Sequence, residues 1–421
     1  MAFGPLTIFD KSFLQSLSKY ESIWFDNFFR TIITPLFFVE TLADLEKHKH
    51  TGKTAQEVVG EIASKTPDMN SVPNVHHFNL LVSNLLGYPV EMRRRPIISG
   101  GIPKVSGSGY GLYFEEFPEA AALDRWQKGN FLETERDFAK NWRVALANPS
   151  FETSIAMAVN TIPSNQRFSD LAQIKAFVDK FLQDTSIEHL YLLFEMMNIP
   201  AKARPRILER WKQAEKPKIS VFAPYAHFVF SIDLFFYISL GYGHIAKERA
   251  SNKIDIAYLY YLPFSHVFIS NDNLHKRTVP IFMESDQQFI VGDEIKPDLC
   301  KLDKYYELLP QEVKDEGIIK FATYPPQDLP TKIAEIWDKY LPIWRKHDDE
   351  DKKKYKENKN NEELLKYLKS IKKAPLYRGT KPISSDAANN VTITRSIRTR
   401  KGKWRTVPKS VEDEANKNKG D

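Results

Sequence analysis

Two aspartates stand at the ends of a strongly apolar segment in the second half of the chain. Asp255 begins and Asp272 ends the stretch DIAYLYYLPFSHVFISND, where burial discourages charged side chains. A short β-type run, LTIF, is likewise followed directly by an acid, Asp10. Clustered carboxylates repel one another and need a cation, and oxygen ligands favour Mg²⁺ or Mn²⁺ over Zn²⁺. An acidic metal site of this kind can activate water to attack a phosphodiester.

The elements around these acids are predicted to bring them to one place. Asn252 can cap a short helix, IDIAYLYYL, that Pro263 ends, so Asp255 falls in the first turn. The run VFIS predicts a buried strand with Asp272 just past its end. In open α/β sheets, sites form outside the carboxyl ends of parallel strands. We therefore expect Asp10, Asp255 and Asp272 on one rim of a parallel sheet.

Glu40 is a fourth candidate acid, in the helical segment FFVETLADL. Thr34 is a good N-cap residue and Pro35 fits the first helical position, so we expect the helix to begin there. The apolar residues of this helix fall on the side opposite to Glu40, which by pattern alone is a solvated acid. Purely structural roles for the other acids also stay open. Asp255 can simply favour a helix N-terminus, and Asp272 can simply open a turn.

The order of these segments resembles a known family. Strand–Asp with a following Ser (FDKSFLQSL), helix–Glu (FFVETL), helix–Asp (IDIAYLYYL) and strand–Ser–x–Asp (FISNDNLH) together resemble the PIN domain, a metal-dependent nuclease fold. The resemblance implies an α/β/α sandwich with a parallel sheet that cuts RNA, or sometimes DNA, with Mg²⁺ or Mn²⁺. It assigns the catalytic and metal-binding roles to Asp10, Glu40, Asp255 and Asp272. It makes Ser12 and Ser270 accessory residues, with Asn271 and His275 next to the site.

The domain organisation follows from the spacing of these motifs. The matched segments cover roughly a quarter of the chain, and 215 residues separate Glu40 from Asp255. We therefore predict a split PIN-like domain at 1–60 and 246–344, with a mainly helical insertion at 61–245. Within the insertion, RRRPIISGGIPKVSGSGYG is predicted to be a loop because of its glycines and prolines. Residues 345–421 are predicted to be a charged linker and a basic tail.

The net charge of +6 is unevenly distributed. Residues 345–421 hold 22 Lys and Arg against 12 Asp and Glu, a net of +10, which leaves 38 basic and 42 acidic residues before them, a net of −4. The final basic stretch, NNVTITRSIRTRKGKWRTVPKS, has no acid and suits phosphate contacts with one stacking contact. A solvated tail is the alternative. The predicted nucleic-acid-binding residues are Arg395, Arg398, Arg400, Lys401, Lys403, Trp404 and Arg405.

Other features bear on the compartment. The single cysteine, Cys300, excludes an intrachain disulfide and suits a reducing, cytoplasmic setting. No secretory signal is expected from the first residues. The apolar stretch 221–243 is long enough to cross a bilayer, but Asp233 lies near its centre, so we expect a buried helix and no membrane partner. Asp233 then needs a partner that the sequence does not identify.

Three functional hypotheses remain at this stage. The first is a nuclease that uses Mg²⁺ or Mn²⁺, with RNA a better expected substrate than DNA. The second is a non-catalytic protein that binds nucleic acid through its tail. The third is a protein regulated by a partner chain that docks on the helical insertion.

Overall fold

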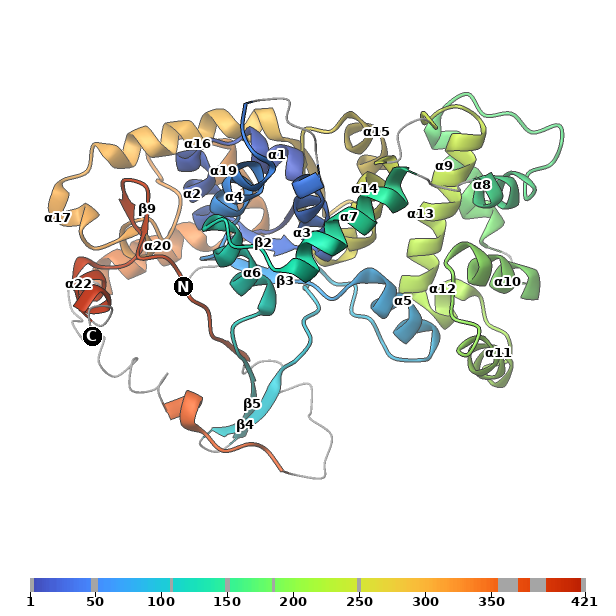
Figure 1. Cartoon of the computed structure of the whole chain (residues 1–421), viewed down its shortest axis with the longest axis horizontal. Coiled ribbons are helices and arrows are strands. Elements are labelled where there is room, and N and C mark those ends of the chain that lie inside the picture. Colours follow the sequence, from blue (N-terminus) through green and yellow to red (C-terminus); the bar gives the residue numbers. More distant parts are fainter. Residues whose placement is uncertain are drawn as a thin grey trace.

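The computed structural model describes residues 4–46, 52–106, 109–147, 152–183, 186–247, 251–354, 370–378 and 391–417. A five-stranded sheet lies at its centre (Figure 1), in the order β3-β2-β1-β6-β7 with all neighbours parallel. The strands are β1 (Leu6–Phe9), β2 (Arg30–Ile33), β3 (Ser71–Pro73), β6 (Val267–Ser270) and β7 (Gln288–Val291). The predicted parallel α/β sheet is thus confirmed, as are the predicted strands LTIF and VFIS.

Alternate residues of the strands enter two separate cores. Ile8 and Phe268 face a core that includes α5 (His77–Leu85), α13 (Pro224–Gly241), the 3₁₀ helix η2 (Tyr258–Phe264) and α15 (Asn273–Phe282). Phe9 and Ile269 face a second core that includes α1 (Lys11–Ser16), α2 (Lys19–Phe28), α16 (Gly292–Glu307) and α19 (Lys332–Tyr340). Strands buried on both faces require helices on both faces, so the sheet is the middle layer of three.

Local signals fix the helices that flank the sheet near its rim. Asp10 caps α1, and Ser18 with Glu21 forms a capping box at α2. Thr34 caps α3 (Pro35–Leu42), with Pro35 at its start as predicted. The 3₁₀ helix η1 (Ala43–Glu46) follows α3, and α4 (Ala55–Lys65) comes next. The helix that carries Asp255 is α14 (Asn252–Ala257), in which Asn252 is the first helical residue rather than the cap.

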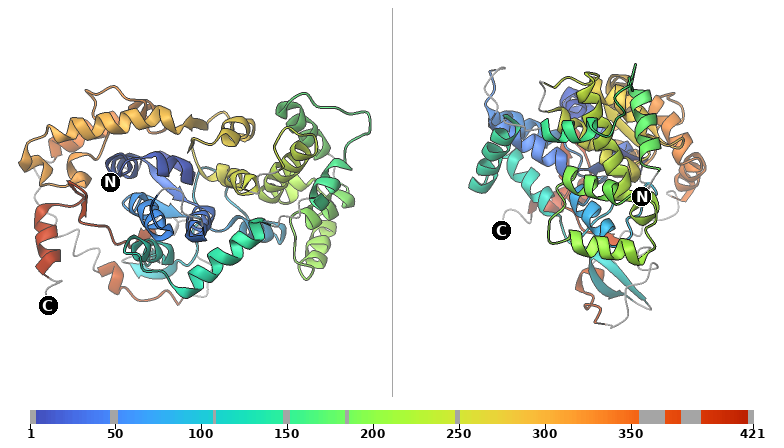
Figure 2. Two further views of the ribbon diagram at one scale, coloured as in Figure 1. Left: turned by 45° about the horizontal axis from the view of Figure 1, so that its top comes forward. Right: turned by 90° about the vertical axis from the view of Figure 1, so that its right-hand side faces the viewer.

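The predicted insertion is mainly helical. After the hairpin β4 (Ile102–Ser106) and β5 (Gly109–Phe114), the helices are α6 (Pro118–Gln127), α7 (Glu133–Ala147), α8 (Glu152–Val159), α9 (Leu171–Phe181), α10 (Ile187–Met196), α11 (Arg204–Gln213) and α12 (Ile219–Phe222). Figure 2 shows α8 to α12 at the end of the molecule opposite to the C-terminal helix. Residues 221–243 form the end of α12, all of α13 and its C-terminal turn. None of the described helices is both long and apolar enough to cross a membrane.

Residues 30–33 form strand β2 soon after α2 ends, and two predictions about the early part of the chain are wrong in detail. The predicted loop contains β4 and the first three residues of β5, in which Gly109 and Gly111 themselves pair with residues of β4. The sheet also includes β3, whose Ser71 pairs with Thr31, so the sheet-forming part extends past the predicted boundary at residue 60.

The described C-terminal residues pack onto the rest of the chain. After β7 the chain continues through α16, α17 (Gln311–Lys314), α18 (Ile318–Phe321), α19 and α20 (Trp344–Lys354). The last described segment contains β8 (Val391–Ile393), β9 (Arg400–Lys401), β10 (Trp404–Arg405) and α22 (Lys409–Lys417). Strand β8 pairs in parallel with β5, so the hairpin and the C-terminal segment share one small sheet. Parts of the predicted linker at 345–421 lie outside the described residues.

Candidate functional site

The sheet has a switch point between its two central strands. The chain builds β1, β2 and β3 in one direction and then returns to place β6 and β7 on the other side of β1. Ligands of open α/β sheets bind outside the carboxyl ends of the strands at this kind of point. Asp10 follows β1 directly, Ser270 ends β6, and Asp272 caps α15 just beyond it. Two of the predicted acids therefore flank the switch point.

Asp10 is held by both elements that meet there. It is buried, with 4% of its surface exposed. Its Oδ1 accepts a hydrogen bond from the backbone N–H of Phe13 at 2.9 Å, which caps α1. Its Oδ2 accepts from the hydroxyls of Ser12 at 2.6 Å and Ser270 at 2.9 Å. Burial on its own raises the pKa of Asp10, but the hydrogen bond and charge of His275 outweigh it and lower that pKa. Asp10 is therefore an ionised carboxylate with a fixed orientation.

His275 joins three segments of the site. Its ring is fully buried, with Nδ1 2.8 Å from Ser270 Oγ and 3.6 Å from Asp10 Oδ2. Its Nε2 lies 2.7 Å from the carbonyl oxygen of Asp255. A carbonyl oxygen accepts only, so Nε2 carries a hydrogen. His275 thus connects the end of β6, the start of α1 and the helix α14.

The hydrogen-bond arrangement also sets the charge on His275. Ser270 Oγ accepts from the backbone N–H of Asp272 at 2.9 Å and donates its one hydrogen to Asp10. Ser270 Oγ then has no hydrogen left for His275 Nδ1, so Nδ1 donates the hydrogen of this contact. With hydrogens on both ring nitrogens, His275 is an imidazolium. Burial lowers the pKa of His275, but the hydrogen bond and charge of Asp10, with the charge of Asp255, raise it to about 9.

Asp255 shares its electrostatic environment with the other three acids. Its pKa is raised to about 7, mainly by burial; the charge of His275 lowers it, and the charges of Glu40, Asp272 and Asp10 raise it. Carboxylates influence one another in this way when they lie near each other at low dielectric. The structure thus brings the four predicted acids into one neighbourhood, in which their negative charges are in excess.

Glu40 reaches the site although its helix pattern indicates a solvated position. Its side chain is 23% exposed, and Oε2 accepts a hydrogen bond from the hydroxyl of Tyr258 at 2.9 Å. Oε1 lies 3.2 Å from Nζ of Lys11. Neither Tyr258 nor Lys11 is among the predicted site residues. Both adjoin predicted positions, since Lys11 follows Asp10 and Tyr258 lies three residues after Asp255.

Asn271 and Asp272 anchor the helices that begin at this rim. Asn271 Oδ1 accepts from the backbone N–H of Asp293 at 3.0 Å, which fixes the start of α16. Asp272 Oδ1 accepts from the backbone N–H groups of Leu274 at 2.6 Å and His275 at 3.3 Å. Asn271 therefore has a structural partner, while Asp272 keeps Oδ2 without a hydrogen-bond partner among the described residues.

The donor chemistry of the site fits a hard divalent cation. Its acidic groups are all carboxylates, and their charges add to the effect of burial in raising the pKa of Asp255; a bound cation would offset these charges. Within the part of the chain that the structure describes, no three His, Cys, Asp or Glu side chains are already arranged to hold a metal ion. The residues present therefore match Mg²⁺ or Mn²⁺ in kind.

The predicted nucleic-acid-binding residues lie elsewhere and are engaged with the body of the protein. Lys401 is 4% exposed, and its Nζ lies 2.5 Å from Asp26 Oδ2 and 2.5 Å from Asp68 Oδ1. Trp404 is 3% exposed, with its ring against Trp24 and its Nε1 donating to Asp303 at 2.7 Å. Such burial is the opposite of a solvated arm.

The other basic residues of this segment have protein partners too. Arg395 donates to the carbonyl oxygens of Asp68 and Met69, and Arg398 pairs with Asp68. The remaining pairs are Arg400 with Glu412, Lys403 with Asp303 and Glu307, and Arg405 with Asp315 and Glu412. Residues 395–405 are therefore not a free basic arm, because acids of the body and Glu412 pair with their charged side chains. The arrangement does not support phosphate contacts by these side chains.

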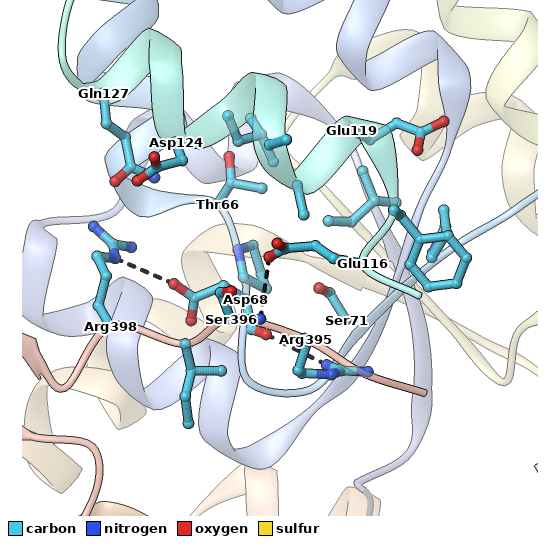
Figure 3. Close-up of a pocket in the computed structure, with 18 of the residues that line it drawn as sticks. Thr66, Asp68, Ser71, Glu116, Glu119, Asp124, Gln127, Arg395, Ser396 and Arg398 are labelled. Carbon is cyan, nitrogen blue, oxygen red and sulfur yellow. Dashed lines mark hydrogen bonds and ion pairs between the residues drawn. The ribbon is translucent and has the colours of Figure 1, made fainter. Parts of the chain in front are cut away.

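A cavity of about 590 Å³ lies beside this segment (Figure 3). Its walls come from α6, the residues just before and within β3, and residues 393–399. Charged groups of the walls pair with one another, as Arg398 does with Asp68, and Glu116 accepts from the backbone N–H of Ser396. None of the four predicted acids lines this cavity, so it is distinct from the candidate site.

Asp233 has the partner that its burial requires. Its Oδ1 accepts from Lys253 Nζ at 2.6 Å and from the hydroxyl of Tyr260. The Lys253 side chain is 27% exposed, and that of Asp233 is 4% exposed. Lys253 lies two residues before Asp255, so this pair ties the helical insertion to the helix that carries a site acid.

Replacing Asp233 with asparagine should lower the free energy of unfolding by about 2–3 kcal/mol, because it leaves the ammonium of Lys253 without its counter-charge. Denaturant unfolding of the full chain measures this difference. The matched control is Asp179→Asn, which breaks the more exposed ion pair with Lys175 and should change the free energy by less than about 0.5 kcal/mol. Equal losses of unfolding free energy from the two changes would mean that the buried pair stabilises the fold no more than the exposed pair does.

No family model, no curated protein and no solved structure matches this chain.

Proposed function

We propose that the chain is a PIN-like, metal-dependent nuclease that hydrolyses phosphodiester bonds. The observation that carries the proposal is the neighbourhood of Asp10, Glu40, Asp255 and Asp272 at the switch point of a parallel sheet. Sheets of this kind place their ligands at that rim. The segments that bear these acids are the ones whose order resembles the PIN domain. The preference for RNA over DNA comes from that resemblance and is part of the test.

Asp10, Asp255 and Asp272, with Glu40 beside them, are the residues that would hold Mg²⁺ or Mn²⁺, which when bound turns water into a nucleophile and offsets charge on the phosphate. The side chains around the acids hold them in place. Ser12 and Ser270 fix Oδ2 of Asp10, and His275 fixes Ser270. Through its bond to the carbonyl of Asp255, His275 also fixes α14 relative to β6. Groups held in this way lose little conformational freedom when a substrate binds.

One observation favours a second candidate, a PIN-like protein without catalysis that is regulated by a partner or binds nucleic acid. Two cations already lie among the acids, because Lys11 pairs with Glu40 and His275 is an imidazolium beside Asp10. Such pairs offset part of the negative charge that would otherwise attract a divalent ion.

The test is cleavage of labelled single-stranded RNA, with single-stranded DNA alongside, in Mn²⁺, Mg²⁺ or EDTA. Cutting that needs the divalent ion, and that an Asp10→Asn/Asp272→Asn protein lacks, supports the proposal. Salt-sensitive binding of RNA without cutting, by both proteins and in both metals, would instead favour the non-catalytic candidate.

A further inference from the structure

Lys11 places a fixed positive charge inside the acidic site. It is the first residue of α1, directly after Asp10, and its side chain is 6% exposed. Lysine is rarely this buried unless its ammonium is paired. Here Nζ lies 3.1 Å from both carboxylate oxygens of Asp44, 3.2 Å from Glu40 Oε1 and 3.2 Å from the Glu40 carbonyl oxygen. An ammonium has three hydrogens to donate, and these oxygens accept all of them.

The surroundings keep this ammonium charged. Two carboxylates and a carbonyl oxygen surround Nζ, and all of these oxygens accept hydrogen bonds from it. Lys11 is therefore a permanent cation of the site at neutral pH.

Glu40 differs from Asp255 and Asp272 in its partners. Its Oε1 is paired with the ammonium of Lys11, and its Oε2 accepts from the hydroxyl of Tyr258. The hydrogen bonds to both oxygens of Asp10 come instead from neutral N–H and hydroxyl groups. Among the described residues, the carboxylate of Asp255 and Oδ2 of Asp272 have no hydrogen-bond partner. The side of the site toward Asp255 and Asp272 thus has open oxygens, while the side toward Glu40 is already neutralised.

We infer that the ammonium of Lys11 takes the place of a second metal ion, so that the site binds one divalent cation. Asp10, Asp255 and Asp272 are its ligands, and Glu40 is the counter-ion of Lys11. This inference rests on the proposed metal binding and makes it more specific. Two-metal sites hold their ions about 3.5–4 Å apart, and an ammonium bonded to Glu40 repels a second ion there.

The experiment counts Mn²⁺ bound by the full-length chain at equilibrium, from the electron paramagnetic resonance signal of the free ion. The wild type should bind one Mn²⁺ per chain. Lys11→Met should bind a second Mn²⁺, or bind the first about tenfold more tightly because a repelling charge is gone. Glu40→Gln should still bind one ion, with an affinity within about threefold of the wild type, a difference below 1 kcal/mol.

A second variant guards against a folding defect. Lys11→Met leaves Asp44 buried without the ammonium, so Lys11→Met/Asp44→Asn removes both charges and frees Glu40 alone. It should show the same gain in Mn²⁺ binding, with a thermal unfolding transition that shows it is folded. A purely structural Lys11 would change the stability and leave the count and the affinity as they are.

The outcomes separate the two proposals. Two ions bound by the wild type, or a Glu40→Gln protein whose affinity drops more than about tenfold, would overturn the inference about Lys11 and leave the metal site standing. Folded Lys11 variants that bind Mn²⁺ as the wild type does would overturn it equally. No Mn²⁺ bound by any of the proteins would overturn the proposed metal-dependent function itself, and the inference with it.

Discussion

The Asp10→Asn/Asp272→Asn protein should cut RNA about 10³-fold more slowly than the wild type, or not measurably. Removing two ligands of a divalent ion removes several kcal/mol of stabilisation of the transition state, and about 4 kcal/mol corresponds to roughly 10³-fold. Initial rates of cleavage in Mn²⁺, with enzyme in excess of substrate, measure the change.

Asparagine is chosen because it preserves the architecture of the rim. Asp10 caps α1 and Asp272 caps α15, and asparagine caps helices as well as aspartate does. We therefore expect the variant to stay folded with both helices capped, and its thermal unfolding midpoint to fall because the negative charge beside the buried His275 is lost. The matched control is Asp124→Asn/Asp179→Asn, which makes the same two chemical changes in exposed ion pairs outside the site. Unchanged cutting by the site variant would mean that the activity belongs to another site or to a contaminant.

Replacing Lys401 with methionine should lower the free energy of unfolding by about 3–5 kcal/mol, because it leaves a buried carboxylate without its counter-charge. Asp26 has no exposed surface, and besides Lys401 it accepts backbone N–H groups of Asp68, Met69 and Asn70. Urea unfolding at pH 7 measures the difference. The control is Lys409→Met, since Lys409 is 55% exposed and 4.0 Å from Asp315.

The loss of unfolding free energy on replacing Lys401 with methionine should change with pH in a defined direction. Burial raises the pKa of Asp26, but the charge and hydrogen bond of Lys401 outweigh it and lower that pKa below its usual 3.8. In the wild type the stabilisation by this group is therefore present above pH 3.8 and is lost below it. Without Lys401, burial raises the pKa of Asp26, so the variant regains stability as the pH falls toward 4. A deficit that grows between pH 7 and pH 4 would contradict this account.

The central strands and their acids could be predicted because each is a short apolar run that ends abruptly in a charged residue. LTIF before Asp10 and VFIS before Asp272 carry that signal in a few residues. Parallel pairing of two such strands then follows from the helical segments between them. Strand β2 could not be predicted as a separate element because the apolar stretch continues from α2 into β2 without a turn residue. Strand β3 has three residues and ends in Pro73, and proline argues against a strand.

The environments of the site residues could not be predicted from local pattern. Glu40 falls on the polar side of its helix, and only the packing of η2 brings Tyr258 to it. The basic segment looks solvated because the acids that pair with it, such as Asp26 and Asp303, lie far away in sequence. Ion pairs between distant positions leave no periodic signal in either segment, so composition alone favoured a free arm.

The sheet also determines when the site can exist during synthesis of the chain. Its central pair joins Thr7 to Val267, and Lys401 reaches back to Asp26. Ribosomes add about 5–20 residues per second, so the 260 positions between those strands take roughly 15–50 s to appear. For most of that interval Asp10 and Glu40 have been made, but Asp255, β6 and Asp272 have not. A nascent chain therefore carries two of the four site acids but lacks strand β6, beside which they are placed. The candidate site stays incomplete until β6 and the residues around it have left the ribosome.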